Sequence, residues 1–340
     1  MQKITTRSLL ALLLSTLFLF TGCEKQKTTT TGNDASAEQS AVAGKQTAPV
    51  NGGSSDHVDE STPKQHQPQQ HSDLLQKVTV IGASVSAGMG AQLVWNDGDT
   101  ARIQPLVFAD VIDATIRTSH RPVRSHASSY FFSDADQFGE KFITQTLKDD
   151  PTLVIGLDFL FWFTYGTYFP SENADTMTQR LNDLQKGLDL AGKIHCPMVL
   201  GDIPDMHGAA EWMLPDYAIP PEDELKAINK RIHQWADKHE NVIILPLAEM
   251  QRKIKNKQEI RVGENTWAGE NVGQLLLADG LHPSGEGQIA LGQLVFQTLL
   301  DSDWNVNPDG LILNKEEALL NLRKHLLALQ EKNEEEPSNP

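Results

Sequence analysis

Short apolar runs alternate with longer amphipathic stretches from about residue 74 to residue 330. Apolar runs of about 4–8 residues are typical of buried strands, and apolar residues three and four positions apart are typical of helices. We therefore predict strands at Val78–Gly82, 122–127, 152–157, Met198–Gly201 and 242–247. Helices are predicted at 105–117, 134–147, 173–190, 222–239 and 314–330, and another from residue 285 onwards. This alternation predicts one α/β domain, residues 74–330, in which a doubly wound parallel sheet of about five strands lies between two helical layers.

The first 22 residues have a different pattern. Lys3 and Arg7 precede an apolar run over residues 8–20. That run is shorter than the ~20 residues that a helix needs to cross a bilayer, so residues 1–22 are predicted to be a signal peptide. The run ends in Phe20-Thr21-Gly22-Cys23, which resembles a bacterial lipobox. The resemblance implies cleavage before Cys23 and acylation of its thiol.

Residues 23–73 are rich in Thr, Ser, Gln, Ala, Gly and Pro and contain few large apolar residues. Such a composition predicts a disordered linker between the lipid anchor and the domain. Residues 331–340 are predicted to be a charged tail. We expect an exported, membrane-anchored lipoprotein. Glu24 after the cysteine favours the outer membrane, with the domain facing the periplasm or the cell surface.

Candidate chemistry begins where the first predicted strand ends. Gly82 and the small residues that follow it allow a sharp turn from the strand into a helix. This places Ser84 at the carboxyl end of a strand, where open α/β sheets bind ligands. The N–H groups at the start of that helix would stabilise a developing oxyanion. The alternative is that Ser84 merely caps the helix.

A second segment, almost two hundred residues later, supplies the partners that a serine nucleophile needs. His282 follows Asp279 by three residues, so a tight turn lets the carboxylate orient the imidazole. Pro283 restricts the chain after the histidine, and Ser284 is placed to cap the next helix. The sequence therefore predicts a catalytic triad of Ser84, Asp279 and His282.

These motifs resemble those of the GDSL/SGNH hydrolases over about residues 76–300. Gly82-Ala83-Ser84 stands in place of Gly-Asp-Ser, and Asp279-Gly-Leu-His282-Pro matches the motif near the end of the domain. The resemblance implies a flavodoxin-like strand order, with Ser84 as nucleophile, His282 as general base and Asp279 as its orienting partner.

The resemblance also implies an oxyanion hole of three donors. They would be the N–H of Ser84, a backbone N–H after the second strand, near Ser128 or Ser129, and a side chain at Asp158. The family has glycine at the second position and asparagine at the third. An ionised aspartate cannot donate a hydrogen bond. Asp158 is therefore expected either to be protonated or to turn away and bind backbone groups.

Residues 158–169 contain seven aromatic side chains. They form either a hydrophobic plug over the end of the sheet or a pocket wall beside Ser84. The substrate-binding candidates are Phe159 and Trp162 in this run, and Trp212 in the loop after the fourth strand. Asp202, Asp205 and His207 lie in the same loop, and we interpret them as turn-forming and solvated residues. No metal and no cofactor are expected.

The net charge of −16 becomes −18 when the two basic residues of the signal peptide are removed. This charge argues against nucleic acid and anionic lipid surfaces as partners. We expect a serine esterase that hydrolyses short-chain acyl esters, such as O-acetyl groups on carbohydrate. The alternatives are a lysophospholipase or lipase, an acyltransferase, and a catalytically silent binding lipoprotein of the same fold.

Overall fold

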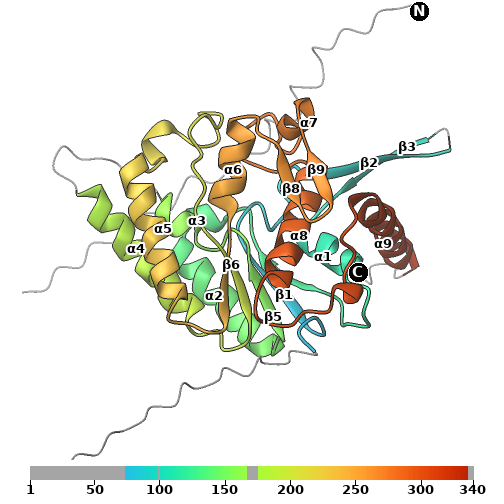
Figure 1. The fold of residues 1–340 in the computed structure, drawn as a ribbon, viewed down its shortest axis with the longest axis horizontal. Helices are drawn as coiled ribbons and strands as arrows, with labels where there is room; N and C mark the ends of the chain where they lie inside the picture. Colours follow the sequence, from blue (N-terminus) through green and yellow to red (C-terminus); the bar gives the residue numbers. More distant parts are fainter. Residues whose placement is uncertain (1–72, 99, 167–174, 336–340) are drawn as a thin grey trace, which may run out of the picture. The chain divides into compact units, whose positions relative to one another are not determined.

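The computed structural model describes residues 73–98, 100–166 and 175–335 (Figure 1). The chain divides into two units, Met1–Pro63 and Lys64–Pro340, and every described residue belongs to the second. The predicted signal peptide, Cys23 and nearly all of the predicted linker therefore lie outside the described residues. None of the helices in the described ranges is both long enough and apolar enough to span a bilayer.

Five parallel strands form the central sheet in the order β4-β1-β5-β6-β7. The chain passes from β1 outward to β4 and then returns to β5 on the other side of β1. This order confirms the predicted doubly wound, flavodoxin-like sheet. The strand order reverses at β1 and β5, which is where open sheets of this kind bind ligands. The strands are β1 Val78–Gly82, β4 Arg124–Ala127, β5 Leu153–Gly156, β6 Met198–Gly201 and β7 Val242–Leu245.

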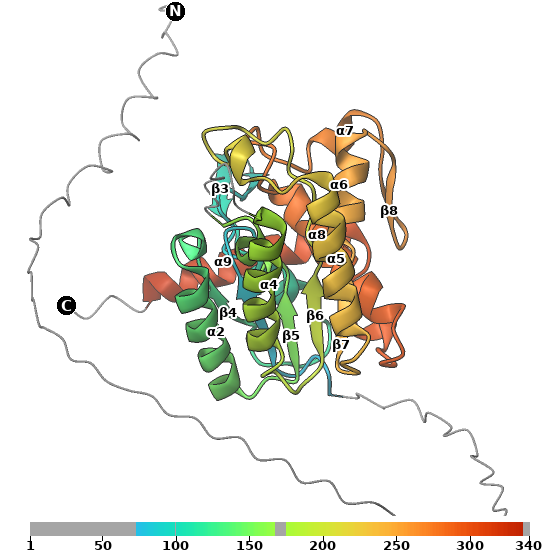
Figure 2. The same cartoon turned by 90° about the vertical axis from the view of Figure 1, so that its left-hand side faces the viewer.

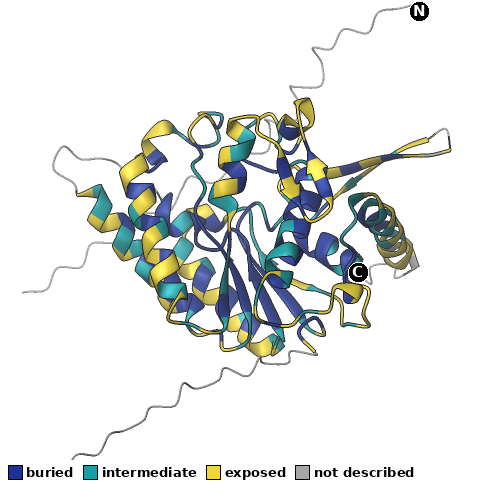
Figure 3. Ribbon diagram, in the orientation of Figure 1, coloured by how far each residue is buried: buried dark blue, intermediate teal, exposed yellow. Residues whose placement is uncertain are grey.

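Alternate side chains of the buried strands pack into two separate helical layers. Ile81 and Val154 belong to a core with α2, α4 and α5, which cover one face of the sheet (Figure 2). Val80 and Ile155 belong to a second core with α1 and α8 on the other face. The central strands are therefore buried on both sides (Figure 3). The bounds of the helices are α1 Phe108–Thr115, α2 Ala135–Asp149, α4 Thr176–Ala191, α5 Glu222–Ala236 and α8 Gly285–Leu300.

The sequence did not predict two antiparallel hairpins. One joins β2 Gln92–Asp97 to β3 Thr100–Pro105, and the other joins β8 Ile260–Val262 to β9 Asn265–Trp267. The first hairpin projects from the domain beside α9 (Figure 1) and replaces the start of the helix predicted from residue 105. The remaining elements are α3 Phe161–Thr164, α6 Leu247–Lys255 and α7 Glu270–Gly273, with single turns at Phe131–Ser133, Asp216–Ala218 and Pro308–Gly310.

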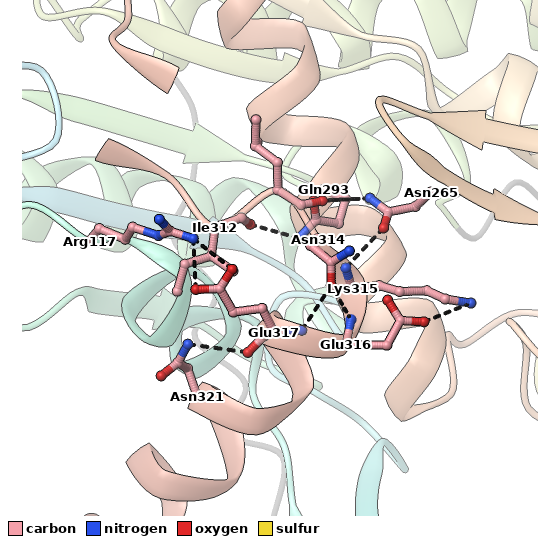
Figure 4. A network of polar contacts seen from close by, with 10 residues as sticks. Arg117, Asn265, Gln293, Ile312, Asn314, Lys315, Glu316, Glu317 and Asn321 are labelled. Atoms are coloured by element: carbon pink, nitrogen blue, oxygen red, sulfur yellow. Dashed lines mark hydrogen bonds and ion pairs between the residues drawn. The ribbon is translucent and has the colours of Figure 1, made fainter. Parts of the chain in front are cut away.

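The last helix, α9 Lys315–Glu335, docks on α1 and α8 through a polar network at its start (Figure 4). Glu317 accepts two hydrogen bonds from Arg117, and Asn314 caps the helix by accepting from the N–H groups of residues 316 and 317. The helix is longer than the predicted 314–330. Part of the segment predicted to be a charged tail is therefore helical.

Candidate active site

The nucleophile turn follows β1 directly and requires glycine at its first position. A Cβ at Gly82 would lie 2.1 Å from Asp158 Oδ1 and 2.4 Å from Ser86 Oγ, so any side chain there would force the turn apart. Ala83–Met89 then form consecutive turns, with the N–H of Ala87 bonded to the carbonyl of Ala83. The predicted helix behind Ser84 is wrong, because these turns lead into the β2–β3 hairpin.

Ser84, His282 and Asp279 form one continuous chain of hydrogen bonds. The Oγ of Ser84 lies 2.9 Å from Nε2 of His282, and Nδ1 of the same ring lies 2.8 Å from Oδ2 of Asp279. His282 is only 2% exposed and Ser84 only 8% exposed. The structure thus brings together the three residues that the sequence predicted as a triad, in the required order.

The turn between Asp279 and His282 fixes the histidine ring. Oδ1 of Asp279 accepts hydrogen bonds of 2.9 Å from the N–H groups of both Leu281 and His282. Gly280 makes the turn possible at a φ of 66°, a backbone conformation that favours glycine. Burial raises the pKa of Asp279, but the hydrogen bonds from His282 and Leu281 outweigh it and lower that pKa below its ordinary value. The carboxylate is therefore ionised where a protonated imidazole needs it.

Ser284 and Gln288 attach α8 to this site. Ser284 caps α8 by accepting from the N–H of Gly287 at 3.1 Å, as the sequence predicted. Gln288 is completely buried, and its side-chain amide donates to the carbonyl of Val85 at 2.9 Å. The helix after the base thus also holds the turn that carries the nucleophile. Gln288 could not be predicted from the sequence, because a single glutamine on an apolar helix gives no distinct signal.

Asp158 accepts hydrogen bonds from the nucleophile turn on both of its carboxylate oxygens. Oδ1 accepts from the N–H of Ala83 at 2.9 Å and from the hydroxyl of Ser86 at 2.6 Å. Oδ2 accepts from the N–H of Val85 at 2.8 Å and from the N–H of Ser86 at 3.4 Å. Burial raises the pKa of Asp158, and these four hydrogen bonds act against it. Asp158 is therefore not an oxyanion donor but the group that holds the turn, the second of the two alternatives expected from the sequence.

The N–H of Ser84 is left available by this arrangement. Asp158 takes the N–H groups of the residues on either side, and the N–H of Ser84 has no hydrogen-bond partner among the described residues. The chain after β4 runs beside it, because Ser128 donates its N–H to the carbonyl of Gly82 at 3.2 Å. Ser129 comes next and is half-buried. The role of its N–H as a second oxyanion donor stays a prediction.

The three predicted substrate-binding aromatics do not line the cavity beside Ser84. Phe159 is completely buried, with its ring 5.9 Å from Phe131 and 5.8 Å from Phe163. Trp162 packs against Phe132, with ring centres 5.8 Å apart, and Trp212 is 77% exposed. The assignments of Phe159 and Trp162 are corrected, because the turn after β5 directs most of the aromatic run into the core. Trp212 follows β6 instead, and its side chain is not part of the cavity lining. Tyr168 and Phe169 lie outside the described residues.

Phe161 and Tyr165 are the aromatics of this run that shape the site. Phe161 lines the cavity and stacks on Tyr165, with ring centres 4.1 Å apart. The Tyr165 hydroxyl donates to the carbonyl of Pro204 at 2.8 Å and accepts from the N–H of Met206 at 3.1 Å. Tyr165 thus fixes the loop after β6. The sequence contains one indication of this role. Tyr165 places a hydroxyl group inside an apolar run, and a buried tyrosine hydroxyl requires a hydrogen-bond partner.

The cavity itself lies between the carboxyl ends of β5 and β6, α6 and the segment that carries His282. Its volume is about 90 Å³, and most of its lining is aliphatic. Asp202 lies in the wall, where it accepts a hydrogen bond of 2.7 Å from the N–H of Ala248 at the start of α6. Across the described ranges, no group of three or more His, Cys, Asp and Glu side chains is arranged to hold a metal ion.

No family model matches this chain, and no curated protein matches it. Solved structures do resemble it, at low identity. They include GDSL-like lipases and esterases. A GDSL-like lipase from Bacteroides thetaiotaomicron is 16% identical, with 66% of this chain and 88% of that chain covered and a TM-score of 0.39. A catalytic mutant of an acetylxylan esterase from Geobacillus stearothermophilus is 12% identical, with 68% and 97% covered and a TM-score of 0.42.

A gut microbial diltiazem-metabolizing enzyme is also 12% identical, with a TM-score of 0.43. The match covers 66% of this chain and 46% of that enzyme, so this chain spans about half of its length. Identities and TM-scores this low leave the function of this chain to be decided by the geometry of its own site.

Proposed function

We propose that this chain is a serine ester hydrolase of the GDSL/SGNH type, with Ser84 as nucleophile, His282 as general base and Asp279 as the residue that orients His282. The observation that carries the proposal is the hydrogen-bonded chain from Ser84 through His282 to Asp279, at 2.9 Å and 2.8 Å. A buried serine hydroxyl paired with an oriented imidazole beside a cavity is the arrangement that acyl transfer requires.

In the first half of the reaction, Ser84 Oγ attacks the carbonyl carbon of the ester and its proton passes to His282 Nε2. The N–H of Ser84 stabilises the negative charge on the carbonyl oxygen. The bond between the carbonyl carbon and the alkoxy oxygen then breaks. The departing alcohol takes the proton from His282, and the acyl group remains on Ser84.

In the second half, a water molecule gives a proton to His282 Nε2 and its oxygen attacks the acyl carbon. The bond to Ser84 Oγ breaks, His282 returns the proton to the serine, and the free acid leaves. Asp279 stays ionised throughout and stabilises the imidazolium that forms twice in the cycle. If a sugar hydroxyl took the place of water, the same residues would perform acyl transfer.

The decisive experiment is labelling with a fluorophosphonate, which reacts only with an activated serine. We expect residues 73–340 to be labelled at Ser84 and to hydrolyse p-nitrophenyl esters, and the Ser84→Ala protein to do neither. Ser133→Ala is the matched control that should still be labelled, since Ser133 is exposed and its Oγ donates to the carbonyl of Tyr130 at 2.7 Å. A folded wild-type protein that neither labels nor hydrolyses any ester would instead be a silent binding module.

We further propose that the chain is exported and anchored through a lipid on Cys23, because residues 20–23 resemble a lipobox after a basic and apolar leader. The preference for short O-acetyl esters of carbohydrate rested on the linker, the net charge and the aromatic run after β5. Phe159 and Trp162 do not line the cavity, so the third of these supports is lost.

A further inference from the structure

We infer that the cavity beside Ser84 binds an aliphatic acyl chain of about 6–10 carbons, so that medium-chain acyl esters are the preferred substrates. The inference rests on the proposed ester hydrolysis for its catalytic consequence. Its structural basis is the shape and the chemistry of the cavity wall.

One face of α6 forms a long side of the cavity. Leu247, Met250, Gln251 and Ile254 line it, and their spacing of three, four and seven residues places them on one face of the helix. From the first to the last of them the helix rises about 10 Å. An extended alkyl chain advances roughly 1.25 Å per carbon, given C–C bonds of about 1.5 Å. About eight carbons therefore match this face in length, whereas an acetyl group would cover a small part of it.

The segment that delivers the catalytic histidine forms another part of the wall. Leu275, Leu276 and Leu281 line the cavity on either side of Asp279, and Leu291 adds to this part from α8. The apolar wall and the general base therefore belong to the same piece of chain. An acyl chain in the cavity would lie against the residues that hold His282 in place.

The carboxylates in the wall are already engaged, so they do not make the cavity a site for a polar ligand. Asp158 accepts four hydrogen bonds from the nucleophile turn, and Asp202 accepts one from Ala248 at the start of α6. Apart from Ser84, the remaining polar side chain in the lining is Gln251. Protein interiors are normally close-packed, so an open aliphatic cavity next to a nucleophile indicates space for an apolar ligand.

Of the two parts of an ester, the acyl chain would contribute more to catalysis by binding in this cavity than the alcohol would. The acyl group is bonded to Ser84 Oγ from the first attack until water releases it, whereas the alcohol leaves after the first half. Contacts with the acyl chain therefore act in both transition states. Each methylene moved from water into the cavity should raise kcat/KM about fourfold until the cavity is filled.

The experiment is a two-armed series of esters with residues 73–340. In the first arm, p-nitrophenyl esters run from acetate to palmitate, and kcat/KM should rise to a maximum between hexanoate and decanoate. In the second arm, acetate esters carry alcohols of increasing length, and no comparable rise is expected. A fall in kcat/KM beyond butyrate in the first arm, or a rise confined to the second, would overturn the inference while leaving ester hydrolysis intact. A maximum at palmitate would also overturn the stated length.

Substitution inside the cavity tests its location. Met250→Trp fills space on the α6 face, and should lower the ratio of kcat/KM for octanoate to that for acetate by about tenfold or more. Leu147→Trp, at an exposed leucine of α2 outside the cavity, is the matched control and should leave the ratio unchanged. An unchanged ratio in a folded Met250→Trp protein would place the acyl chain elsewhere.

A binding measurement keeps the inference testable even if no ester is hydrolysed. The Ser84→Ala protein retains the cavity, so octanamide should raise its melting temperature and acetamide at the same concentration should not. The Met250→Trp change in the same background should abolish the rise. Equal effects of the two amides would contradict the inference independently of catalysis.

Discussion

Asp158 performs a different task from the asparagine that the motif resemblance places at this position. An asparagine there would donate its amide hydrogens to the substrate oxyanion, whereas the carboxylate of Asp158 accepts hydrogen bonds from Ala83, Val85 and Ser86. The charge of the aspartate is thus used within the protein, to hold the nucleophile turn in one conformation. We therefore expect the oxyanion to depend on backbone N–H groups, first that of Ser84.

Asp158→Asn should therefore lower activity rather than restore an oxyanion donor. The amide nitrogen of an asparagine donates hydrogen bonds and cannot accept one. At least one N–H group of the nucleophile turn would therefore point at an NH₂ group in place of a carboxylate oxygen. Loss of one charge-assisted hydrogen bond costs about 1.5–3 kcal/mol, which corresponds to about a ten- to hundredfold loss in kcat/KM. Steady-state kinetics and the rate of fluorophosphonate labelling would measure this loss of activity. Full activity in Asp158→Asn would show that the side chain donates to the substrate after all.

The pKa of Asp158 gives this prediction a pH dependence. Burial raises that pKa, so the carboxyl group of the folded protein takes up a proton at a higher pH than an exposed aspartate does. A protonated oxygen loses acceptor capacity, and we expect the labelling rate of the wild type to fall as the pH falls through this pKa. The residual labelling of Asp158→Asn should lack that part of the pH dependence. Identical relative profiles for the two proteins would contradict the assignment.

The three triad residues should act as one unit. Ser84→Ala and His282→Ala should each lower kcat by about 10⁴-fold or more, because neither half of the pair performs the attack alone. The double variant should be hardly slower than either single variant. Measured losses that multiply in the double variant would show that the two residues do not share one step. Melting curves of all three proteins verify that the fold is retained.

At the level of the helices and strands, the sheet was predictable and the hairpins were not. The strands of the sheet are continuous apolar runs such as Val78–Gly82, buried on both faces, and this pattern leaves little choice of structure. The β2–β3 hairpin alternates buried Leu93 and Trp95 with exposed Val94, but the run is short and its partner core includes α9, more than two hundred residues away. Its burial pattern depends on contacts that the local sequence does not contain.

The same limit applies to the site. The serine and the Asp-x-x-His turn are local motifs, and the sequence predicted all three residues. After β5, packing decides the direction of each side chain. Phe159 is buried in the core whereas Phe161 lines the cavity, although both belong to the same aromatic run. The cavity itself is formed by α6 and the segment before His282, and no motif marks that pairing.

The docking of α9 on α1 should depend on pH. His325 on α9 lies 3.3 Å from Asp113 and 3.7 Å from Asp110, and His120 lies 3.4 Å from Asp113. The close contact with Asp110, and the negative charges of Asp113 and Asp110, raise the pKa of His325 above 6.5, although burial acts against them. Because the pKa is higher in the folded state, this stabilisation is complete below about pH 6.5 and is lost as the pH rises through the folded value.

We therefore expect His325→Gln to lower the melting temperature more at pH 6 than at pH 8. Protection of α9 against hydrogen exchange should follow the same trend. Asn321→Ala on the same helix is the control, since the Asn321 amide bonds the carbonyl of Glu317 at 3.2 Å and carries no titratable group. An equal loss for His325→Gln at both pH values would contradict the ion-pair explanation.

For the whole molecule, the proposed lipid anchor can be tested by replacing each of the two cysteines of the chain in turn. The full-length protein made in a bacterium with a lipoprotein pathway should partition into detergent, and Cys23→Ser should shift it to the aqueous phase or leave it unprocessed. Cys196→Ser is the matched control and should behave like the wild type, because Cys196 lies in the domain. A Cys23→Ser protein that is processed and still partitions into detergent would show that the membrane link lies elsewhere.

The nucleophile and its base come from opposite ends of the domain, 198 residues apart in the chain. At a synthesis rate of about 5–20 residues per second, Ser84 leaves the ribosome roughly 10–40 seconds before His282 does. During that interval the serine has no partner to take its proton, and the segment that covers the cavity does not yet exist. A nascent or unfolded chain would therefore be chemically harmless to the esters of the cell that makes it, and the proposed hydrolytic activity would begin only when α8 and the turn that carries His282 have completed the fold.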